Sequence, residues 1–147
     1  MFKHILVPTD GSELSNDTVK RAVLFAKETG AIITFFFAKP GYPIAYYGEG
    51  ALIDLTTPEQ FTEMANKQAQ RILSAAEKLA AEAEVECNSV SVSNDIPYEA
   101  IIDAANTAGC DLIFMASHGR RGISGFLLGS ETQKLLTHTK IPVLVYR

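Results

Sequence analysis

The sequence predicts an α/β fold in which helices cover both faces of a parallel β-sheet, a three-layer sandwich. Short apolar runs such as Leu112–Met115 have the length and composition of buried strands, and they alternate along the chain with amphipathic stretches. Strands that alternate with helices pair in parallel through right-handed crossovers. No segment repeats and no shift in composition marks a boundary, so we expect residues 1–147 to form a single domain.

The composition is typical of a globular protein and argues against several classes of function. Hydrophobic residues make up 47% of the chain, charged residues 20%, and the net charge is −4 without a run of like charge. Because of this charge, there is no basic field to attract nucleic acid or an anionic membrane. The sequence also has no apolar run of about 18 residues, which a membrane-spanning helix needs, and no signal-peptide pattern. We expect a cytoplasmic protein that binds neither nucleic acid nor membrane. Cys87 and Cys110 match no metal or redox spacing and are expected to be small buried hydrophobes.

Two strands and one helix are expected near the N-terminus. Ile5–Val7 should form a strand that ends at Pro8, and Thr9–Ser12 has the polar residues of a turn that leads into a helix. The apolar residues of that helix share one face: Val19, Ala22, Val23 and Ala26. Gly30 is expected to end the helix, and Ile32–Ala38 to form a second strand that is covered on both faces.

A long irregular segment, Lys39–Thr57, separates this strand from the next helix. Its tyrosines either close over a flat ligand or pin the loop to itself. Thr57 and Pro58 are typical of an N-cap and of the first helical position. One side of the helix that follows is expected in the core: Phe61, Met64, Ala65, Gln68, Ile72, Ala75, Ala76, Leu79 and Ala83.

The second half of the chain continues the alternation. A strand is expected over Val85–Val92, and Asn94–Pro97 turns the chain into a helix that ends at Gly109. That helix carries Ala100, Ile101, Ala104 and Ala105. The strand at Leu112, a helix with Leu135 and Leu136, and a final strand in Ile141–Arg147 complete the order.

The glycine-rich stretch Ala116–Ser130 connects a buried strand to a helix. Ser130 at an expected N-cap and Gln133 three residues later match the spacing of a capping box. Glycine lets backbone N–H groups approach a ligand, and a helix N-terminus favours an anion, most often phosphate. Arg120 and Arg121 could add charge-assisted hydrogen bonds. The alternative is a surface connection whose glycines only relieve strain, because neither a Walker loop nor a G-x-G-x-x-G turn is present.

Two loops are expected at the same edge of the sheet. Pro8–Ser12 follows the first strand and Ala116–Ser130 follows the fourth. In open α/β sheets, ligands bind beyond the carboxyl ends of the strands where the winding reverses. If the reversal falls between these strands, both loops face one crevice, which favours a ligand that carries phosphate.

With both loops in view, the chain resembles a single-domain universal stress protein along nearly its whole length. The resemblance is carried by Val7–Ser12, by Ala116–Gly119 through Gly129-Ser130, and by Ile141–Val145. It implies a Rossmann-like fold similar to adenine nucleotide alpha hydrolases, with a five-stranded parallel sheet of order 3-2-1-4-5 and four helices. It also implies an ATP site in members with the pattern G-x-x-G, nine residues, then G-[ST].

The resemblance implies a role for each residue of that site. The first-strand turn would lie near adenine and ribose, with Asp10 accepting hydrogen bonds, and Ala38 would offer backbone to the adenine edge. The glycine loop would surround ribose and phosphates, and the following helix start would receive phosphate oxygens, although Ser130 could be only an N-cap. The residues so implied are Pro8, Thr9, Asp10, Ala38, Ala116, His118, Gly119, Arg120, Arg121, Gly122, Gly129, Ser130, Glu131 and Thr132.

Three positions depart from the family pattern. Ala116 replaces the first glycine, which is tolerated if its φ is negative but separates backbone and ligand if φ is positive. Phe37 stands where histidine is frequent. Asp95 replaces a glycine before the third helix, and its charge would repel phosphates unless a divalent cation intervenes.

The function favoured by the resemblance is a regulatory module of the stress response that binds ATP, AMP or ADP, with Mg²⁺ or Mn²⁺ as a companion ion. The alternatives are a weak metal-dependent ATPase and an interaction protein that binds no nucleotide. No spacing aligns a base with water, so catalytic residues are not assigned. The last strand, Ile141–Tyr146, has two apolar faces and an edge to pair, so we expect a homodimer through it unless a helix of the same chain covers it.

Overall fold

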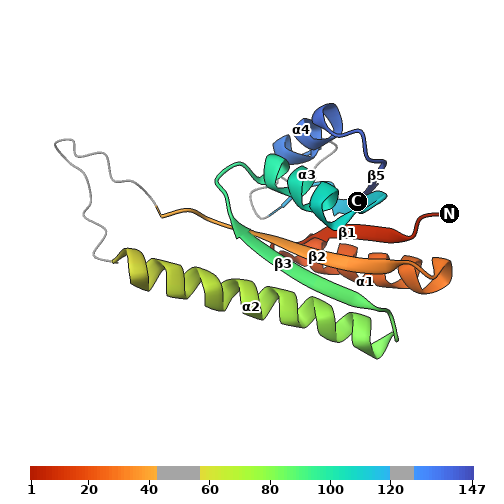
Figure 1. The fold of residues 1–147 in the computed structure, drawn as a ribbon, viewed down its shortest axis with the longest axis horizontal. Helices are drawn as coiled ribbons and strands as arrows, with labels where there is room; N and C mark the ends of the chain where they lie inside the picture. Colours follow the sequence, from red (N-terminus) through yellow and green to blue (C-terminus); the bar gives the residue numbers. More distant parts are fainter. Residues whose placement is uncertain (43–56, 120–127) are drawn as a thin grey trace.

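A computed structural model describes residues 1–42, 57–119 and 128–147. Five strands alternate with four helices (Figure 1). In chain order these elements are β1 (His4–Pro8), α1 (Glu13–Thr29), β2 (Ile32–Lys39), α2 (Pro58–Glu82), β3 (Cys87–Ser93), α3 (Pro97–Ala108), β4 (Leu112–Ala116), α4 (Ser130–His138) and β5 (Val143–Tyr146). The alternation predicted from the sequence is confirmed for this part of the chain.

The strands form one parallel sheet in the order β3-β2-β1-β4-β5. Helices α1 and α2 lie on one face and α3 and α4 on the other, which gives three layers (Figure 1). The predicted strand order and fold class are therefore confirmed. The winding reverses between β1 and β4, because β2 and β3 extend the sheet in one direction from β1 whereas β4 and β5 extend it in the other.

Two hydrophobic clusters hold the layers together. Ile5 and Val7 of β1 face the α1 and α2 layer, whereas Leu6 between them faces α3 and α4. Alternate residues of a strand point to opposite faces, so a strand covered on both sides must be apolar throughout. The same alternation in Phe35, Phe36 and Phe37 of β2 confirms that this strand is covered on both faces.

The helix boundaries follow the expected local chemistry. Gly30 and Gly109 end α1 and α3 in the left-handed region, with φ of 71° and 68°, which glycine adopts without a Cβ penalty. Thr57 caps α2 and forms a capping box with Gln60, with Pro58 in the first turn. These starts and stops confirm the boundaries predicted for α1, the end of α3 and the start of α2.

The stripe predicted for α2 is partly wrong. Met64 is 64% exposed and Ala75 is exposed, whereas Ala69, Leu73 and Ala80 are buried. The α2 residues of the main core cluster begin at Ala69. In the first turn of the helix, Phe61 instead contacts the ring of Tyr42, with ring centroids 5.5 Å apart. A 25-residue helix can present an apolar stripe that its neighbours cover only in part.

The described residues contain no helix that is both long enough and apolar enough to cross a bilayer. The expectation for the cysteines holds for Cys110, which is buried, but only in part for Cys87, which is half-buried. Burial raises the pKa of the Cys110 thiol to about 11. A thiol with such a pKa stays protonated at neutral pH and is a poor nucleophile.

Candidate functional site

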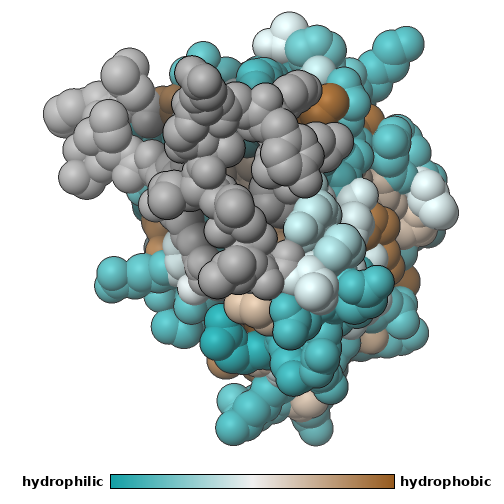
Figure 2. Space-filling view, turned by 90° about the vertical axis from the view of Figure 1, so that its left-hand side faces the viewer, coloured by the Kyte–Doolittle hydropathy of each residue, from teal (hydrophilic) through white to brown (hydrophobic). Residues whose placement is uncertain are grey.

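A cleft of about 670 Å³ opens at the carboxyl ends of the strands, where the winding reverses. Figure 2 shows this side of the molecule, on which hydrophilic side chains form most of the described surface. Every predicted site residue that the structure describes lines the cleft: Pro8, Thr9, Asp10, Ala38, Ala116, His118, Gly119, Gly129, Ser130, Glu131 and Thr132. Arg120, Arg121 and Gly122, which were also predicted, lie outside the described residues. A volume of this size is in the range of small-molecule sites.

The turn between β1 and α1 orients Asp10. Its Oδ1 accepts a hydrogen bond from the Ser12 N–H at 2.9 Å, and its own N–H donates to Ser15 Oγ at 3.2 Å. Ser15 Oγ also donates to Thr9 Oγ1 at 2.8 Å, and both of these side chains are buried. Ser15 was missed at the level of sequence, because it lies one turn inside the helix among ordinary helical positions. The network fixes the backbone that carries the Asp10 carboxylate toward the cleft.

The end of β4 and the start of α4 are joined directly by hydrogen bonds. Ser117 donates its N–H to the Tyr146 carbonyl, and the Ser117 carbonyl accepts from the Gly129 N–H, both at 2.8 Å. The Thr132 hydroxyl donates to the carbonyls of Ser117 at 3.0 Å and Ala116 at 3.3 Å. The buried Thr132 side chain thus ties the helix to the strand, so its role is to position the first turn of α4.

The predicted capping box at Ser130 is wrong. Gly129 is the N-cap, Ser130 is the first helical residue, and the helix start has no hydrogen bond from a capping side chain. Gln133 donates its side-chain Nε2 to the Leu128 carbonyl at 2.8 Å instead of accepting from an N-cap. The start shifts by one residue because the Gly129 N–H is used by the Ser117 carbonyl, so that the chain enters the helix immediately afterwards.

The first turn of α4 therefore presents backbone donors at the cleft. The N–H groups of the first three helical residues, Ser130 to Thr132, have no acceptor within an α-helix. A cap side chain satisfies one of the corresponding donors in α1, where Ser12 accepts from the Ser15 N–H, and one in α2, where Thr57 accepts from the Gln60 N–H. In α4 the cap is a glycine, so the donors and the positive end of the helix dipole remain available to a ligand.

All three departures from the family pattern lie among the described residues. Ala116 ends β4 opposite Tyr146, and Glu84 is the non-glycine residue with positive φ among those described. The methyl group of Ala116 therefore imposes no backbone strain. Asp95 lies at the cleft and its Oδ1 accepts from the Gly41 N–H at 2.9 Å, so this carboxylate fastens the segment after β2. Phe37 is buried at the same edge.

The cleft combines few charges with many backbone groups. Among the residues that the structure describes, no group of three or more His, Cys, Asp or Glu side chains could hold a metal ion. His118 Nδ1 lies 3.1 Å from Ser117 Oγ, within its own loop. What this arrangement offers is a set of amide donors at one end, a carboxylate acceptor at Asp10, and the backbone of Ala38 beyond it.

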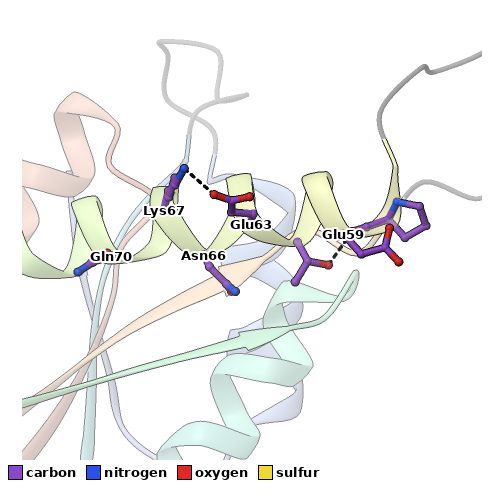
Figure 3. A pocket seen from close by; sticks show the side chains of 7 residues that line it. Glu59, Glu63, Asn66, Lys67 and Gln70 are labelled. Atoms are coloured by element: carbon purple, nitrogen blue, oxygen red, sulfur yellow. Dashed lines mark hydrogen bonds and ion pairs between the residues drawn. The ribbon is translucent and has the colours of Figure 1, made fainter.

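A second hollow, of about 550 Å³, lies along the first half of α2 (Figure 3). Its described lining is Pro58, Glu59, Thr62, Glu63, Asn66, Lys67 and Gln70. These residues all belong to one helix, and Glu63 and Lys67 form an ion pair of 2.7 Å between side chains that are mostly exposed. Among the residues that the structure describes, the hollow brings together no chemistry from separate elements, so the cleft at the sheet edge is the candidate site.

Comparisons with known proteins agree with this fold. The model of the universal stress protein family matches residues 1–147. Universal stress protein YxiE of Bacillus subtilis is 30% identical over 158 residues, covering 100% of both chains. The structure of universal stress protein UspA from Lactobacillus plantarum superposes with a TM-score of 0.77 at 22% identity, covering 99% of this chain and 97% of that one. A universal stress protein solved in complex with cAMP gives a TM-score of 0.71 at 25% identity, covering 99% and 97%.

Proposed function

Because the chain belongs to the universal stress protein family, we propose that it is a regulatory module of the stress response that binds an adenine nucleotide, ATP, ADP or AMP, in the cleft at the sheet edge. The observation that carries the proposal is the uncapped first turn of α4, whose amides lie at the edge of a cleft large enough for a nucleotide. The related protein solved with cAMP supports an adenine nucleotide as the ligand class.

In this proposal the phosphate lies at the start of α4. The N–H groups of Ser130, Glu131 and Thr132 and the Ser130 hydroxyl donate to its oxygens, and Gly129 lets the backbone approach closely. A Cβ built on Gly129 would lie 3.2 Å from the Ser117 carbonyl oxygen and from Cα of His118, so a side chain there would displace this backbone. Mg²⁺ or Mn²⁺ would reach the cleft bound to the phosphates of ATP.

The nucleoside then extends toward β1 and β2. Asp10 accepts a hydrogen bond from a ribose hydroxyl, since its carboxylate is held in the turn by the Ser12 N–H at 2.9 Å. Pro8 and Thr9 form the wall beside it, and the Ala38 backbone meets the adenine edge. His118 and Gly119 line the cleft on the side of β4, and the family resemblance would add Arg120, Arg121 and Gly122 as contacts to ribose and phosphates. A ligand without a phosphate would use only half of these contacts.

The module would act as a dimer joined through β5. This strand lies at one edge of the sheet and hydrogen-bonds to β4 on its inner side. All four of its residues remain partly exposed, so helices of the described chain do not cover it fully. A second copy related by a two-fold axis would pair with the free edge and bury these side chains.

Analysis of the ligand that accompanies the purified protein tests the proposed function. Protein purified without added nucleotide is denatured, and the supernatant is examined by absorbance at 260 nm and by mass spectrometry. We expect an adenine nucleotide from the wild type and its loss from the Asp10→Ala/Ser130→Ala double variant. Protein without a co-purified nucleotide that also fails to bind AMP, ADP or ATP would exclude the nucleotide-binding function and favour an interaction protein.

A further inference from the structure

Glu131 places a carboxyl group in the turn proposed to receive phosphate. It is the second residue of α4, lies at the cleft, and is partly buried. An acidic side chain in a first helical turn is favourable for the helix, but beside a phosphate it would repel the ligand. The direction in which the carboxylate points therefore decides whether Glu131 opposes or supports binding.

The Glu131 carboxylate is engaged by α3 and by Lys134. Oε2 accepts a hydrogen bond from the Tyr98 N–H at 3.0 Å, and Oε1 accepts from Lys134 Nζ at 3.1 Å. Tyr98 is the second residue of α3, and the N-cap of that helix, Ile96, provides no side-chain hydrogen bond. Glu131 thus supplies the missing cap of α3, and its charge is compensated by the positive end of the α3 dipole and by the lysine.

Aromatic contacts strengthen the same junction between α3 and α4. The ring of Tyr98 lies against His138, with centroids 5.0 Å apart, and Lys134 Nζ lies 5.8 Å from the Tyr98 ring centroid. Lys134 and His138 follow Glu131 along α4 at helical spacing, so one side of this helix faces the start of α3. Helix α4 is thereby held against the start of α3, and Glu131 makes the hydrogen bond that joins its first turn to α3.

The other side of that turn is held by β4. The Gly129 N–H and the Thr132 hydroxyl both donate to the Ser117 carbonyl. Glu131 lies between Gly129 and Thr132 in the sequence, but its side chain bonds to helix α3 and not to the sheet. With the Glu131 bond removed, the first turn keeps its anchor on the strand but loses its own hydrogen bond to α3, whereas Lys134 and His138 further along α4 still contact Tyr98.

We infer that Glu131 is a positioning residue for the phosphate end of the site, because it holds the amides of the first α4 turn toward the cleft by capping α3 and keeps its own charge away from the ligand. The inference rests on the proposed function. It requires no contact between the Glu131 side chain and the nucleotide.

Titration calorimetry of Glu131→Ala, Glu131→Gln and wild-type protein with AMP and with adenosine tests this inference. Glutamine keeps an oxygen that can accept from the Tyr98 N–H, whereas alanine does not. We expect Glu131→Ala to weaken AMP binding by about tenfold and adenosine binding by less than about twofold, with Glu131→Gln within about threefold of the wild type for AMP. Glu13→Ala, at the first turn of α1, is the matched control and should change neither affinity.

A structural readout accompanies the titration. Hydrogen exchange at the Tyr98 amide should accelerate in Glu131→Ala and stay near the wild-type rate in Glu131→Gln, because only the first loses the acceptor. AMP binding that is tighter than the wild type by more than about threefold in either variant, or equal AMP affinity in all proteins, would overturn the positioning role while leaving the proposed function intact. Wild-type protein that binds neither ligand would overturn the proposed function and this inference with it.

Discussion

Gly119 lies directly against the carboxylate of Asp10: a Cβ built on Gly119 would stand 2.6 Å from Asp10 Oδ2. The two residues come from the loops after β4 and β1, which the strand order places side by side. Asp10 Oδ1 is at the same time held by the Ser12 N–H. The absence of a side chain at residue 119 therefore lets the carboxylate keep the orientation set by its own turn.

Gly119→Ala should weaken nucleotide binding by about tenfold or more while lowering stability by less than about 1 kcal/mol. The added methyl meets the end of a flexible side chain, so Asp10 can rotate away, and it then no longer accepts from the ribose. Calorimetry of AMP binding and urea unfolding measure the two effects.

A double-mutant cycle with Asp10→Ala gives the control for this prediction. If alanine at residue 119 acts by displacing the carboxylate, it should have little further effect on affinity once that carboxylate has been removed. Full additivity of the two losses would show that Gly119 acts on the ligand by another route.

Ser130→Ala should separate a ligand contact from a helix cap. Since Gly129 is the N-cap and Ser130 makes no capping hydrogen bond, its loss should change the free energy of unfolding by less than about 0.5 kcal/mol. Loss of a hydroxyl donor to phosphate should still weaken AMP binding by about tenfold. Urea unfolding and calorimetry on the same preparations provide both numbers.

Ser12→Ala is the matched variant, because the Ser12 side chain does cap α1 by accepting from the Ser15 N–H. It should cost about 1 kcal/mol of stability. A larger loss of stability in Ser130→Ala than in Ser12→Ala would contradict the assignment of Gly129 as the cap of α4.

Val145→Pro should convert the proposed dimer into a monomer. The Pro142 carbonyl accepts from the N–H of Ile113 in β4, and the Tyr146 carbonyl accepts from the N–H of Ser117 directly after β4. Because successive residues of a strand turn their backbone groups to opposite sides, the backbone of Val145 faces the outer edge of the sheet. Proline at this position removes a donor from the outer edge while the inner ladder is retained. Light scattering at micromolar concentration should give the mass of one chain for the variant and of two for the wild type.

Leu144→Pro provides the comparison, since the Leu144 N–H faces β4 by the same alternation. Leu144→Pro should lower the free energy of unfolding by about 3 kcal/mol. A wild-type mass of one chain, or a dimer that persists in Val145→Pro, would remove β5 from the interface.

Asp111→Asn should reduce stability at neutral pH by about 1–2 kcal/mol. The Asp111 carboxylate accepts from the N–H groups of Lys3 at 2.9 Å and His4 at 3.0 Å, tying the start of the chain to β4. Burial raises the pKa of Asp111, but the hydrogen bonds from His4 and Lys3 outweigh it, so its pKa lies below the ordinary value. Urea unfolding at several pH values measures the effect.

The sign of the pH dependence follows from the lowered pKa. The stabilisation by Asp111 is fully present above its unfolded pKa of about 3.9 and is lost as the pH falls through the lower folded pKa. The difference between the wild type and Asp111→Asn should therefore shrink below about pH 4. Asp103→Asn, at an exposed position of α3, should leave stability unchanged, and a gap of constant size down to pH 2 would contradict the account.

The alternation of strands and helices, and with it the edge of the sheet at which the cleft lies, could be predicted from the sequence because short-range patterns determine them. Apolar runs, the turn at Thr9–Ser12, and the glycines at the ends of α1 and α3 are local signals, and their succession leaves few topologies. The strand order itself came from the family resemblance. Together they placed the loops after β1 and β4 at one edge, as the structure confirms.

What the sequence did not predict depends on contacts between distant residues. The capping of α3 by Glu131, the bond from the Gly41 N–H to Asp95, and the Thr132 hydroxyl on the β4 carbonyls join segments with no shared local pattern. The start of α4 was misplaced by one residue for the same reason, since the Ser117 carbonyl decides it. Met64 was placed in the core because periodicity identifies a face but not how far its neighbours extend.

We propose that the amides of the first α4 turn and the Asp10 carboxylate act on the same ligand. Titration calorimetry with AMP and with ATP plus Mg²⁺, together with the thermal midpoint at millimolar nucleotide, tests it most directly. We expect saturable binding of one nucleotide per chain and a higher thermal midpoint in its presence. Asp10→Ala and Ser130→Ala should each weaken the affinity by about tenfold or more and reduce the rise in midpoint accordingly. Wild-type protein that gives no heat and no rise in midpoint with millimolar nucleotide would contradict it.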